Sequence, residues 1–437
     1  SKMKTNFFEF IGFILFLALR RVHLPEDSFA VIEGGRSFSK LDTIPSFFST
    51  FLRQCPQVIY LTETASVWEG QTYDEGLEDL KQSKKSISRV YRMTGKDIHK
   101  YGGYDGDNAE EMELHFGIDG MKFPLYMDYH ATTPVDERVF EEMKPYFTEN
   151  FGNASSIDHS FGYDASVAVQ TARETISNAV GCKMDEIIFT SGATESDNLA
   201  LIGVMEKNKE KGNHLITCKT EHKAILDCAK HLEENGCEVT YLSVNEHGEI
   251  DLNELESAIT EKTVLISLMA ANNEIGTIAN LEEIGKITRK NDVLFHTDAA
   301  QAVGHIPMDV QKMNIDLMAF SSHKLYGPKG IGALFVRSLK PRVKLDSIVY
   351  GGGQERNIRS GTLNVPGIVG FAKAVEIAQN DMEIENKKYK KWTDMLLEEL
   401  EKDGGKLNGH REKRLPHNLN VRFDGIESKA IINSVSK

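Results

Sequence analysis

The residues of this chain best suited to chemistry lie in the segment SSHKLYGPKG, which contains Lys324. An apolar run, 315–320, comes directly before this segment and predicts a strand that ends close to the lysine. A lysine amine whose pKa is lowered by burial or by neighbouring cations forms Schiff bases with carbonyl compounds. Ser321 and His323 beside it could bind an acidic group of the same compound. The alternative is a surface loop with a solvated lysine.

A second candidate group follows the apolar stretch 293–297, which leads into Asp298, with Gln301 three residues further on. Open α/β sheets bind ligands outside the carboxyl ends of their strands, where this aspartate is expected. A carboxylate opposite a pyridine nitrogen would keep that nitrogen protonated and make the ring a stronger electron acceptor. Because aspartate is also a favoured helix cap, a capping role for Asp298 is the alternative.

A third segment, EIIFTSGATESDN, predicts a strand at 186–190, a glycine turn at 191–193 and a helix that begins at Thr194. The N-terminus of a helix after such a turn presents main-chain N–H groups and the positive end of the helix dipole to a phosphate. An ordinary capped helix is the alternative interpretation of this segment.

In this order, the three segments resemble those of the fold type I pyridoxal-phosphate enzymes. Five further runs are similar to those of the cysteine desulfurases: YMDYHATTP, FGNASS, TEHKAILD, NNEIG and GGGQERNIRSGT. The similarity extends from about residue 123 to residue 423. It is greater to the branch that supplies iron–sulfur cluster assembly than to the branch that resembles selenocysteine lyases.

The resemblance implies pyridoxal 5′-phosphate as the cofactor and a role for each matching residue. Lys324 would hold the cofactor as a Schiff base and shuttle protons at the substrate α-carbon, and His222 would stack on the ring and assist the acid–base steps. Asp298 would pair with the pyridinium nitrogen, and Gln301 with the phenolic oxygen. The other implied site residues are Ala193, Thr194, Ser321 and His323 for the phosphate, Thr362 for the phosphate of a second subunit, and Asn273 on the substrate side. Without the resemblance, a helix cap and a turn residue would be preferred for His222 and Asn273.

The implied function is that of a cysteine desulfurase, a pyridoxal-phosphate-dependent sulfurtransferase. Such an enzyme removes sulfur from L-cysteine, and leaves alanine and an enzyme persulfide for iron–sulfur cluster assembly and other sulfur transfer. The implied partners are L-cysteine, a second copy in a homodimer, and an iron–sulfur scaffold or another sulfur-acceptor protein. The alternatives are a non-catalytic desulfurase-like scaffold that binds cofactor or partner proteins, and a selenocysteine lyase.

The sulfur-accepting cysteine of the family lies in a serine- and glycine-rich loop that follows a segment similar to 415–437. The chain as given would therefore lack this loop, and we expect it to be a fragment of a longer protein. The five cysteines do not lie in such a loop and are interpreted as reduced, structural thiols: Cys55, Cys182, Cys218, Cys228 and Cys237.

Cysteine spacing and net charge argue against several kinds of site and partner. The cysteine spacings match no zinc or disulfide framework, so no metal ligands are assigned and a reducing compartment is expected, cytoplasmic or else mitochondrial. The formal net charge of −14 argues against direct nucleic-acid binding, which normally requires a basic face.

From residue 126 onward, short apolar stretches alternate with amphipathic ones, as in doubly wound α/β proteins. The predicted fold is that of a fold type I pyridoxal-phosphate transferase, with a mainly parallel seven-stranded sheet and helices on both faces. The predicted strands are 186–190, 213–217, 238–242, 263–269, 293–297, 316–320 and 331–336. The predicted helices are 135–147, 163–180, 195–208, 221–234, 252–259, 281–290 and 366–402. We expect a large cofactor-binding domain at 121–365 and the start of an incomplete small domain at 366–437.

Residues 1–120 resemble no part of the desulfurase family and stay unassigned. Their apolar run 7–19 is too short to span a bilayer comfortably. A buried or interfacial helix is the preferred interpretation, and membrane attachment is the alternative. The segment 102–111, GGYDGDNAEE, has the composition of a linker. The region is either an appended small domain or a misjoined reading frame.

Overall fold

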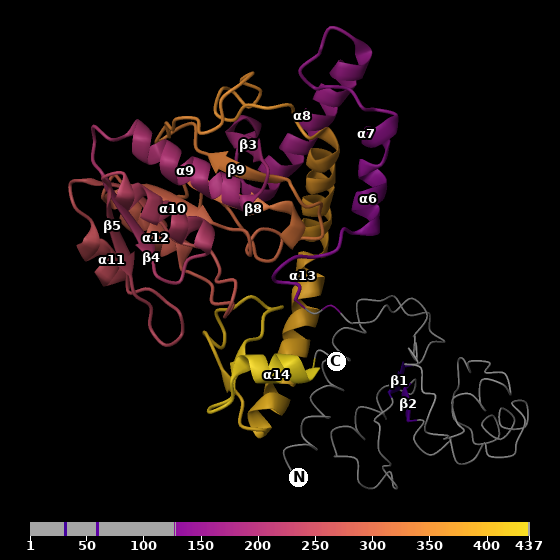
Figure 1. The fold of residues 1–437 in the computed structure, drawn as a ribbon, viewed down its shortest axis with the longest axis vertical. Coiled ribbons are helices and arrows are strands. Elements are labelled where there is room, and N and C mark those ends of the chain that lie inside the picture. Colours follow the sequence, from indigo (N-terminus) through magenta and orange to yellow (C-terminus); the bar gives the residue numbers. More distant parts are fainter. Residues whose placement is uncertain (1–29, 33–57, 61–125, 127, 436–437) are drawn as a thin grey trace, which may run out of the picture. The chain divides into compact units, whose positions relative to one another are not determined.

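The computed structural model describes residues 30–32, 58–60, 126 and 128–435 (Figure 1). Residues 128–425 form one compact unit. A second unit contains two short parallel strands, β1 (Ala30–Ile32) and β2 (Val58–Tyr60), and helix α14 (Ser428–Val435). The predictions for the apolar run 7–19 and the linker 102–111 lie outside the described residues. Among the residues that are described, no helix has the length and apolar character needed to cross a membrane.

A seven-stranded sheet forms the centre of the larger unit, in the order β3-β9-β8-β7-β6-β4-β5. The strands are β3 (Ile187–Thr190), β4 (His214–Cys218), β5 (Glu238–Leu242), β6 (Thr263–Ser267), β7 (Leu294–Asp298), β8 (Leu317–Ser321) and β9 (Gly332–Val336). Only β9 runs antiparallel to its neighbours within this sheet. The prediction of a mainly parallel seven-stranded sheet is confirmed, and every strand lies within two residues of its predicted bounds.

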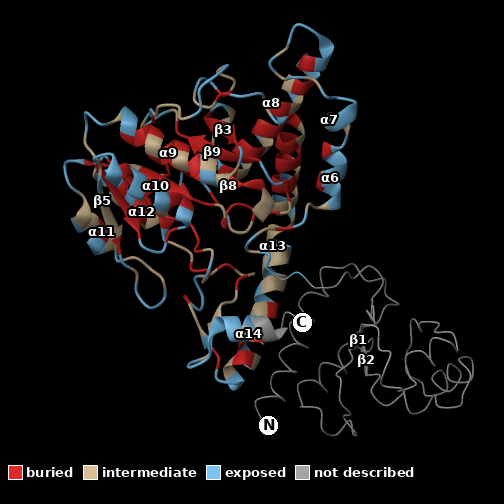
Figure 2. Ribbon diagram, in the orientation of Figure 1, coloured by how far each residue is buried: buried red, intermediate tan, exposed pale blue. Residues whose placement is uncertain are grey.

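The apolar strands predict burial on both sides, since alternate residues of a strand point to opposite faces of a sheet. Ile188 belongs to one hydrophobic cluster together with residues of the 193–207 helix, whereas its neighbour Phe189 belongs to a second cluster together with residues of the 160–180 helix. Leu317 and Met318 of β8 divide between the two clusters in the same way. Helices therefore cover both faces of the sheet, and buried residues fill the layers between them (Figure 2).

The helices of the larger unit are α6 (Glu137–Met143), α7 (Pro145–Thr148), α8 (Ser160–Val180), α9 (Ala193–Lys207), α10 (Lys223–Glu234), α11 (Leu252–Ala258), α12 (Leu281–Lys290) and α13 (Val365–Lys402). The predicted helix 135–147 is wrong in one respect, because it is divided at Pro145, which begins α7. Proline has no N–H to continue a helix but fits the first helical position. The other helices lie within three residues of their predicted bounds.

Helix α13 leads to the segment 405–423, which contains the antiparallel pair β10 (Lys406–Leu407) and β11 (Val421–Arg422). This segment docks on the loop that follows β6 through main-chain bonds. The N–H of Leu415 donates to the carbonyl of Gly276 at 2.9 Å, and the N–H of Ile278 donates to the carbonyl of Lys413 at 3.0 Å. The predicted division into a large and a small domain stays a prediction.

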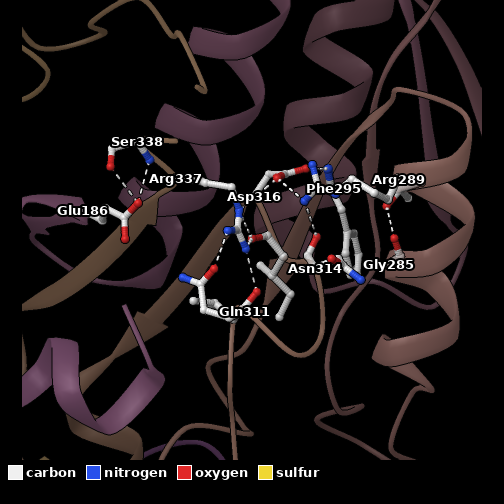
Figure 3. Close-up of polar contacts among 12 residues, drawn as sticks. Glu186, Gly285, Arg289, Phe295, Gln311, Asn314, Asp316, Arg337 and Ser338 are labelled. Carbon is white, nitrogen blue, oxygen red and sulfur yellow. Dashed lines mark hydrogen bonds and ion pairs between the residues drawn. The ribbon is translucent and has the colours of Figure 1, made fainter. Parts of the chain in front are cut away.

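A buried ion cluster fixes the amino ends of β7 and β8. Asp316, directly before β8, accepts a hydrogen bond from the N–H of Phe295 at 3.0 Å (Figure 3). The same carboxylate pairs with Arg289 at 2.9 Å and with Arg337 at 3.2 Å. Arg337 follows β9, and it also donates to two main-chain carbonyls in the turn 310–315. These bonds tie three strands together at the edge of the sheet where the strands β7 and β8 begin.

Candidate active site

A cavity of about 850 Å³ lies at the opposite edge of the sheet, where the parallel strands end. Its wall includes residues that follow β3, β4, β6, β7 and β8, which is where open α/β sheets bind their ligands. The structure brings together nine of the ten predicted site residues at this cavity: Ala193, Thr194, His222, Asn273, Asp298, Gln301, Ser321, His323 and Lys324. Thr362 is exposed and does not line the cavity of its own chain.

Lys324 ends a short 3₁₀ turn, Ser322–Lys324, directly after β8. Its Nζ donates to the main-chain carbonyl oxygens of His130 at 2.5 Å and Ala131 at 3.0 Å, so the protein itself supplies two acceptors for the amine. Burial lowers the pKa of Lys324, against the opposing effect of the Asp298 and Asp128 carboxylates. A half-buried amine with a lowered pKa is suited to act as a nucleophile towards a carbonyl group.

Asp298 is the last residue of β7 and is 7% exposed. Burial raises the pKa of Asp298, while the Ala300 N–H and the charges of His222 and Lys324 act in the opposite direction. Its Oδ1 accepts a hydrogen bond from the N–H of Ala300 at 2.9 Å, and a turn follows, so the carboxylate does not cap an α-helix. The structure therefore holds a buried carboxylate and an amine at one cavity.

The glycine turn before α9 lies directly against β9. Gly192 has φ of 152° and ψ of −179°, a conformation that is almost restricted to glycine. A Cβ on Gly332 of β9 would lie 2.6 Å from the Cα of Gly192, so a side chain there would push the turn away. Helix α9 begins at Ala193, and the first N–H groups of a helix have no acceptor within it. With Ser321 nearby on the cavity wall, this end of the cavity suits a phosphate.

The remaining predicted residues also have local structural partners. His222 is the N-cap of α10, and its Nδ1 accepts from the N–H of Ala224 at 3.1 Å, so this residue both caps a helix and lines the cavity. Gln301 donates from Nε2 to the carbonyl of His130 at 3.0 Å. His323 contacts the Thr132 hydroxyl at 3.0 Å. Burial, followed by the charges of Lys324 and Lys329, lowers the pKa of His323 to about 4, so this imidazole is neutral at physiological pH.

This set of groups fits pyridoxal phosphate at three points. The Lys324 amine matches its aldehyde, the Asp298 carboxylate matches its ring nitrogen, and the turn before α9 matches its phosphate. The cavity also contains a buried polar group that needs a partner, because neither oxygen of Asp197 has a hydrogen bond among the described residues. The residues present therefore fit this cofactor.

Several cavity residues received no role from the sequence: Asp128, His130, Thr132 and Asp197. The first three belong to the run YMDYHATTP, and Asp197 belongs to the segment that contains the glycine turn. Both segments were singled out as motifs. The run YMDYHATTP lies about 190 residues from Lys324 in the chain, so only the motif match could have indicated that it reaches the site.

Four of the five cysteines are described, and none of these four lines the cavity. Burial raises the pKa of each of these thiols, to about 12 in the case of Cys228. Because the thiolate is the nucleophilic form, these four are poor nucleophiles, as expected of structural thiols. Cys55 lies outside the described residues.

Comparisons with known proteins agree with this geometry. Residues 125–437 match the family model "Aminotransferase class-V". A cysteine desulfurase IscS of Anaeromyxobacter sp. strain Fw109-5 is 52% identical over 319 residues, which cover 72% of this chain and 78% of the relative. The IscS of Rickettsia bellii is 50% identical over 320 residues, 73% of this chain and 78% of that protein.

Solved structures show the same relationship. A NifS-like protein has a TM-score of 0.69 and 41% identity, and the match covers 71% of this chain and 85% of that one. DndA from Streptomyces lividans has a TM-score of 0.64 and 36% identity, with 71% and 88% covered. This chain therefore belongs to the class-V aminotransferase family of pyridoxal-phosphate enzymes, in which its curated relatives are cysteine desulfurases.

Proposed function

We propose that this protein is a pyridoxal-phosphate-dependent cysteine desulfurase in which Lys324 binds the cofactor and moves the proton at the substrate α-carbon. One observation carries the proposal. Asp298, at the end of β7, and Lys324, after the neighbouring strand β8, line the same cavity. The N-terminus of α9, which suits a phosphate, lies on the wall of this cavity. The 52% identity to a cysteine desulfurase indicates L-cysteine as the substrate.

When bound, pyridoxal phosphate supplies a ring that accepts the electron pair released at the substrate α-carbon. Asp298 would hold the ring nitrogen in its protonated form, and Ser321, His323 and the start of α9 would bind the phosphate. The Lys324 amine has a pKa lowered by burial, so it exchanges a proton at the α-carbon more readily than a solvated lysine. His222 would act as the second proton carrier, because it lines the same cavity and an imidazole can both accept and donate a proton.

The exposed apolar surface of this chain favours a second copy of the chain as its partner. Helices α6 to α8 and the turn between α7 and α8 expose large apolar side chains: Phe140, Phe147, Phe151, Phe161 and Tyr163 are each more than half exposed. Thr362 is also exposed and outside the cavity of its own chain, as a residue that serves a second subunit would be. We propose a homodimer that covers this apolar face, with an iron–sulfur scaffold or another sulfur acceptor as the later partner.

The function is tested with two measurements. With pyridoxal phosphate bound, the protein should be yellow. Borohydride reduction of this protein, followed by peptide mass spectrometry, should locate a pyridoxyl adduct on Lys324. The protein should also catalyse exchange of the α-proton of L-alanine in D₂O, measured by NMR. L-Alanine has no sulfur to lose, so this measurement is independent of any sulfur-accepting cysteine.

The variant Lys324→Ala should lose both the adduct and the exchange, whereas Lys329→Ala, at the same cavity, should keep the adduct. A colourless, folded wild-type protein would contradict the cofactor assignment. A coloured protein without α-proton exchange would favour the non-catalytic scaffold.

A further inference from the structure

Three histidine rings lie against one another beside the candidate active site. The rings of His130 and His417 are stacked, with centroids 4.9 Å apart and an interplanar angle of 10°. The rings of His305 and His417 are 4.2 Å apart at 36°. His130 precedes α6, His305 lies in the turn after β7, and His417 lies between β10 and β11. His417 is therefore the central ring of the histidine stack, and it comes from the segment 405–423.

Both outer histidines contact Lys324. The main-chain carbonyl of His130 accepts from the Lys324 Nζ at 2.5 Å and from the Gln301 Nε2 at 3.0 Å. The Nε2 of His305 lies 3.0 Å from the main-chain carbonyl oxygen of Lys324. The main-chain carbonyl of His130 thus orients both the Lys324 amine and the Gln301 amide at the cavity.

The residue after His417 ties the segment 405–423 to His130. Nδ2 of Asn418 contacts Nε2 of His130 at 3.2 Å and donates to the carbonyl of Glu274 at 3.2 Å. Arg414 donates to Oδ1 of Asn418 at 2.7 Å. The position of His130 is therefore coupled to the docking of the segment 405–423.

Positive charge on neighbouring rings would disfavour the stack. Burial lowers the pKa of His130 and the Lys324 charge acts in the same direction, whereas hydrogen bonds to Gln301 and to the main chain of His417 and the Asp128 charge oppose this effect. Among the described residues, Tyr389 of α13 lies with its ring centroid 6.0 Å from that of His417, and Arg414 bonds to the adjacent Asn418. Protonation of a ring would place a cation against its neighbours and the Lys324 amine.

On the basis of the proposed function, we infer that the His130–His417–His305 stack is a positioning device. When the segment 405–423 is docked, the stack fixes the position of the main-chain carbonyl of His130, and this carbonyl orients the Lys324 amine. The rings themselves are positioning residues, since the contact with the amine is made by the main chain. Contacts that hold the partner of a functional group in place determine how closely that group keeps its geometry.

The test compares two substitutions of the central ring. His417→Ala removes the stack, whereas His417→Phe keeps an aromatic ring that cannot be protonated. His247→Ala is the matched control, because His247 and His410 form another histidine pair, 5.7 Å apart, whose rings have no contact with Lys324 among the described residues. Two readouts are used: the rate at which the holoprotein loses its visible absorbance on dilution, and the rate of reductive methylation of Lys324 in the apoprotein, followed by mass spectrometry.

At pH 8, His417→Ala should lose cofactor about tenfold faster than the wild type, a change of about 1.4 kcal/mol. Methylation of its Lys324 in the apoprotein should also be about threefold faster, because a displaced carbonyl no longer stabilises the ammonium form. His417→Phe and His247→Ala should remain within twofold of the wild type. As the pH is lowered, the wild type should lose cofactor increasingly faster than His417→Phe, because phenylalanine at the central position cannot take up a proton.

Equal rates for His417→Ala and the wild type in both readouts would overturn the inference. If His417→Ala does not fold, the comparison of the wild type with His417→Phe across pH decides, and parallel profiles would overturn it. A wild-type protein without an adduct on Lys324 would instead refute the proposed function, and the methylation readout would still test the stack.

Discussion

Asp298 and Asp316 are buried aspartates at opposite ends of neighbouring strands, and their surroundings differ. Asp316, before β8, has two arginine partners and a main-chain N–H, all within 3.2 Å. Asp298, at the end of β7, has one main-chain hydrogen bond and faces a cavity. Near it, Asp197 has no hydrogen bond among the described residues, and His296 lies 3.6 Å away.

The difference separates a structural site from a functional one. At the amino edge of β7 and β8 the carboxylate is paired with two guanidinium groups of the protein itself, so the cluster holds the strands in register without any ligand. At the carboxyl edge, carboxylates are buried with fewer partners than they need, which disfavours the folded apoprotein. Such an arrangement is expected where a bound cation or a protonated ring supplies the partner that the buried carboxylates lack.

The largest effect should come from the amino edge. Asp316→Asn leaves the buried Arg337 guanidinium without its carboxylate, so we expect the free energy of unfolding to fall by about 3 kcal/mol, measured by urea denaturation. The matched control is Asp346→Asn, which breaks an exposed pair with Lys207 and should change stability by less than about 1 kcal/mol. A small effect at Asp316 would show that the arginines are satisfied by carbonyl groups alone.

At the carboxyl edge, the same substitution should affect chemistry. Asp298→Asn keeps the size of the side chain but removes the charge that would hold a protonated ring nitrogen. We expect α-proton exchange of L-alanine to fall by about 10²-fold, with the Lys324 adduct retained. Unchanged exchange would remove Asp298 from the proposed site.

The comparison also predicts opposite signs for stability. Burial raises the pKa of both carboxyl groups, but Asp316 has two arginine partners that its loss would leave unpaired. Because burial raises the pKa of Asp298 in the folded chain, its stabilising contribution is fully present below about pH 4 and is lost as pH rises through the folded-state value. Asp298→Asn should therefore stabilise the apoprotein at pH 7 by about 1 kcal/mol and should weaken its loss of stability with rising pH. Thermal unfolding of the apoprotein between pH 4 and pH 8 measures both effects. A destabilised Asp298→Asn apoprotein would show that the two edges do not differ as proposed.

The smallest effect is expected away from both edges. Cys237 is partly exposed, precedes β5 and does not line the cavity. Cys237→Ser should leave α-proton exchange unchanged and alter stability by less than about 0.5 kcal/mol. Loss of exchange in this variant would give a described thiol a role that its position does not suggest.

The apolar pattern predicted the sheet well because all its strands except the edge strand β5 are largely buried and therefore rich in apolar residues. The same apolar runs located Asp298 and Lys324, since Asp298 ends one strand and Lys324 lies three residues after the end of the next. The pattern missed the break at Pro145, where the helical signal continues through a residue that must begin a new helix.

The sequence by itself determined the local units of this protein: which stretches become strands, where the glycine turn lies, and which polar groups stand at strand ends. It could also be matched to a family through its motifs. Only the tertiary structure decided which distant groups meet. The contact between His130 and Asn418, the shared carbonyl of His130, and the partners of Asp316 join residues that are 21 to 288 positions apart. Such contacts depend on how strands and loops pack in space, and a local pattern of residues carries no signal for them.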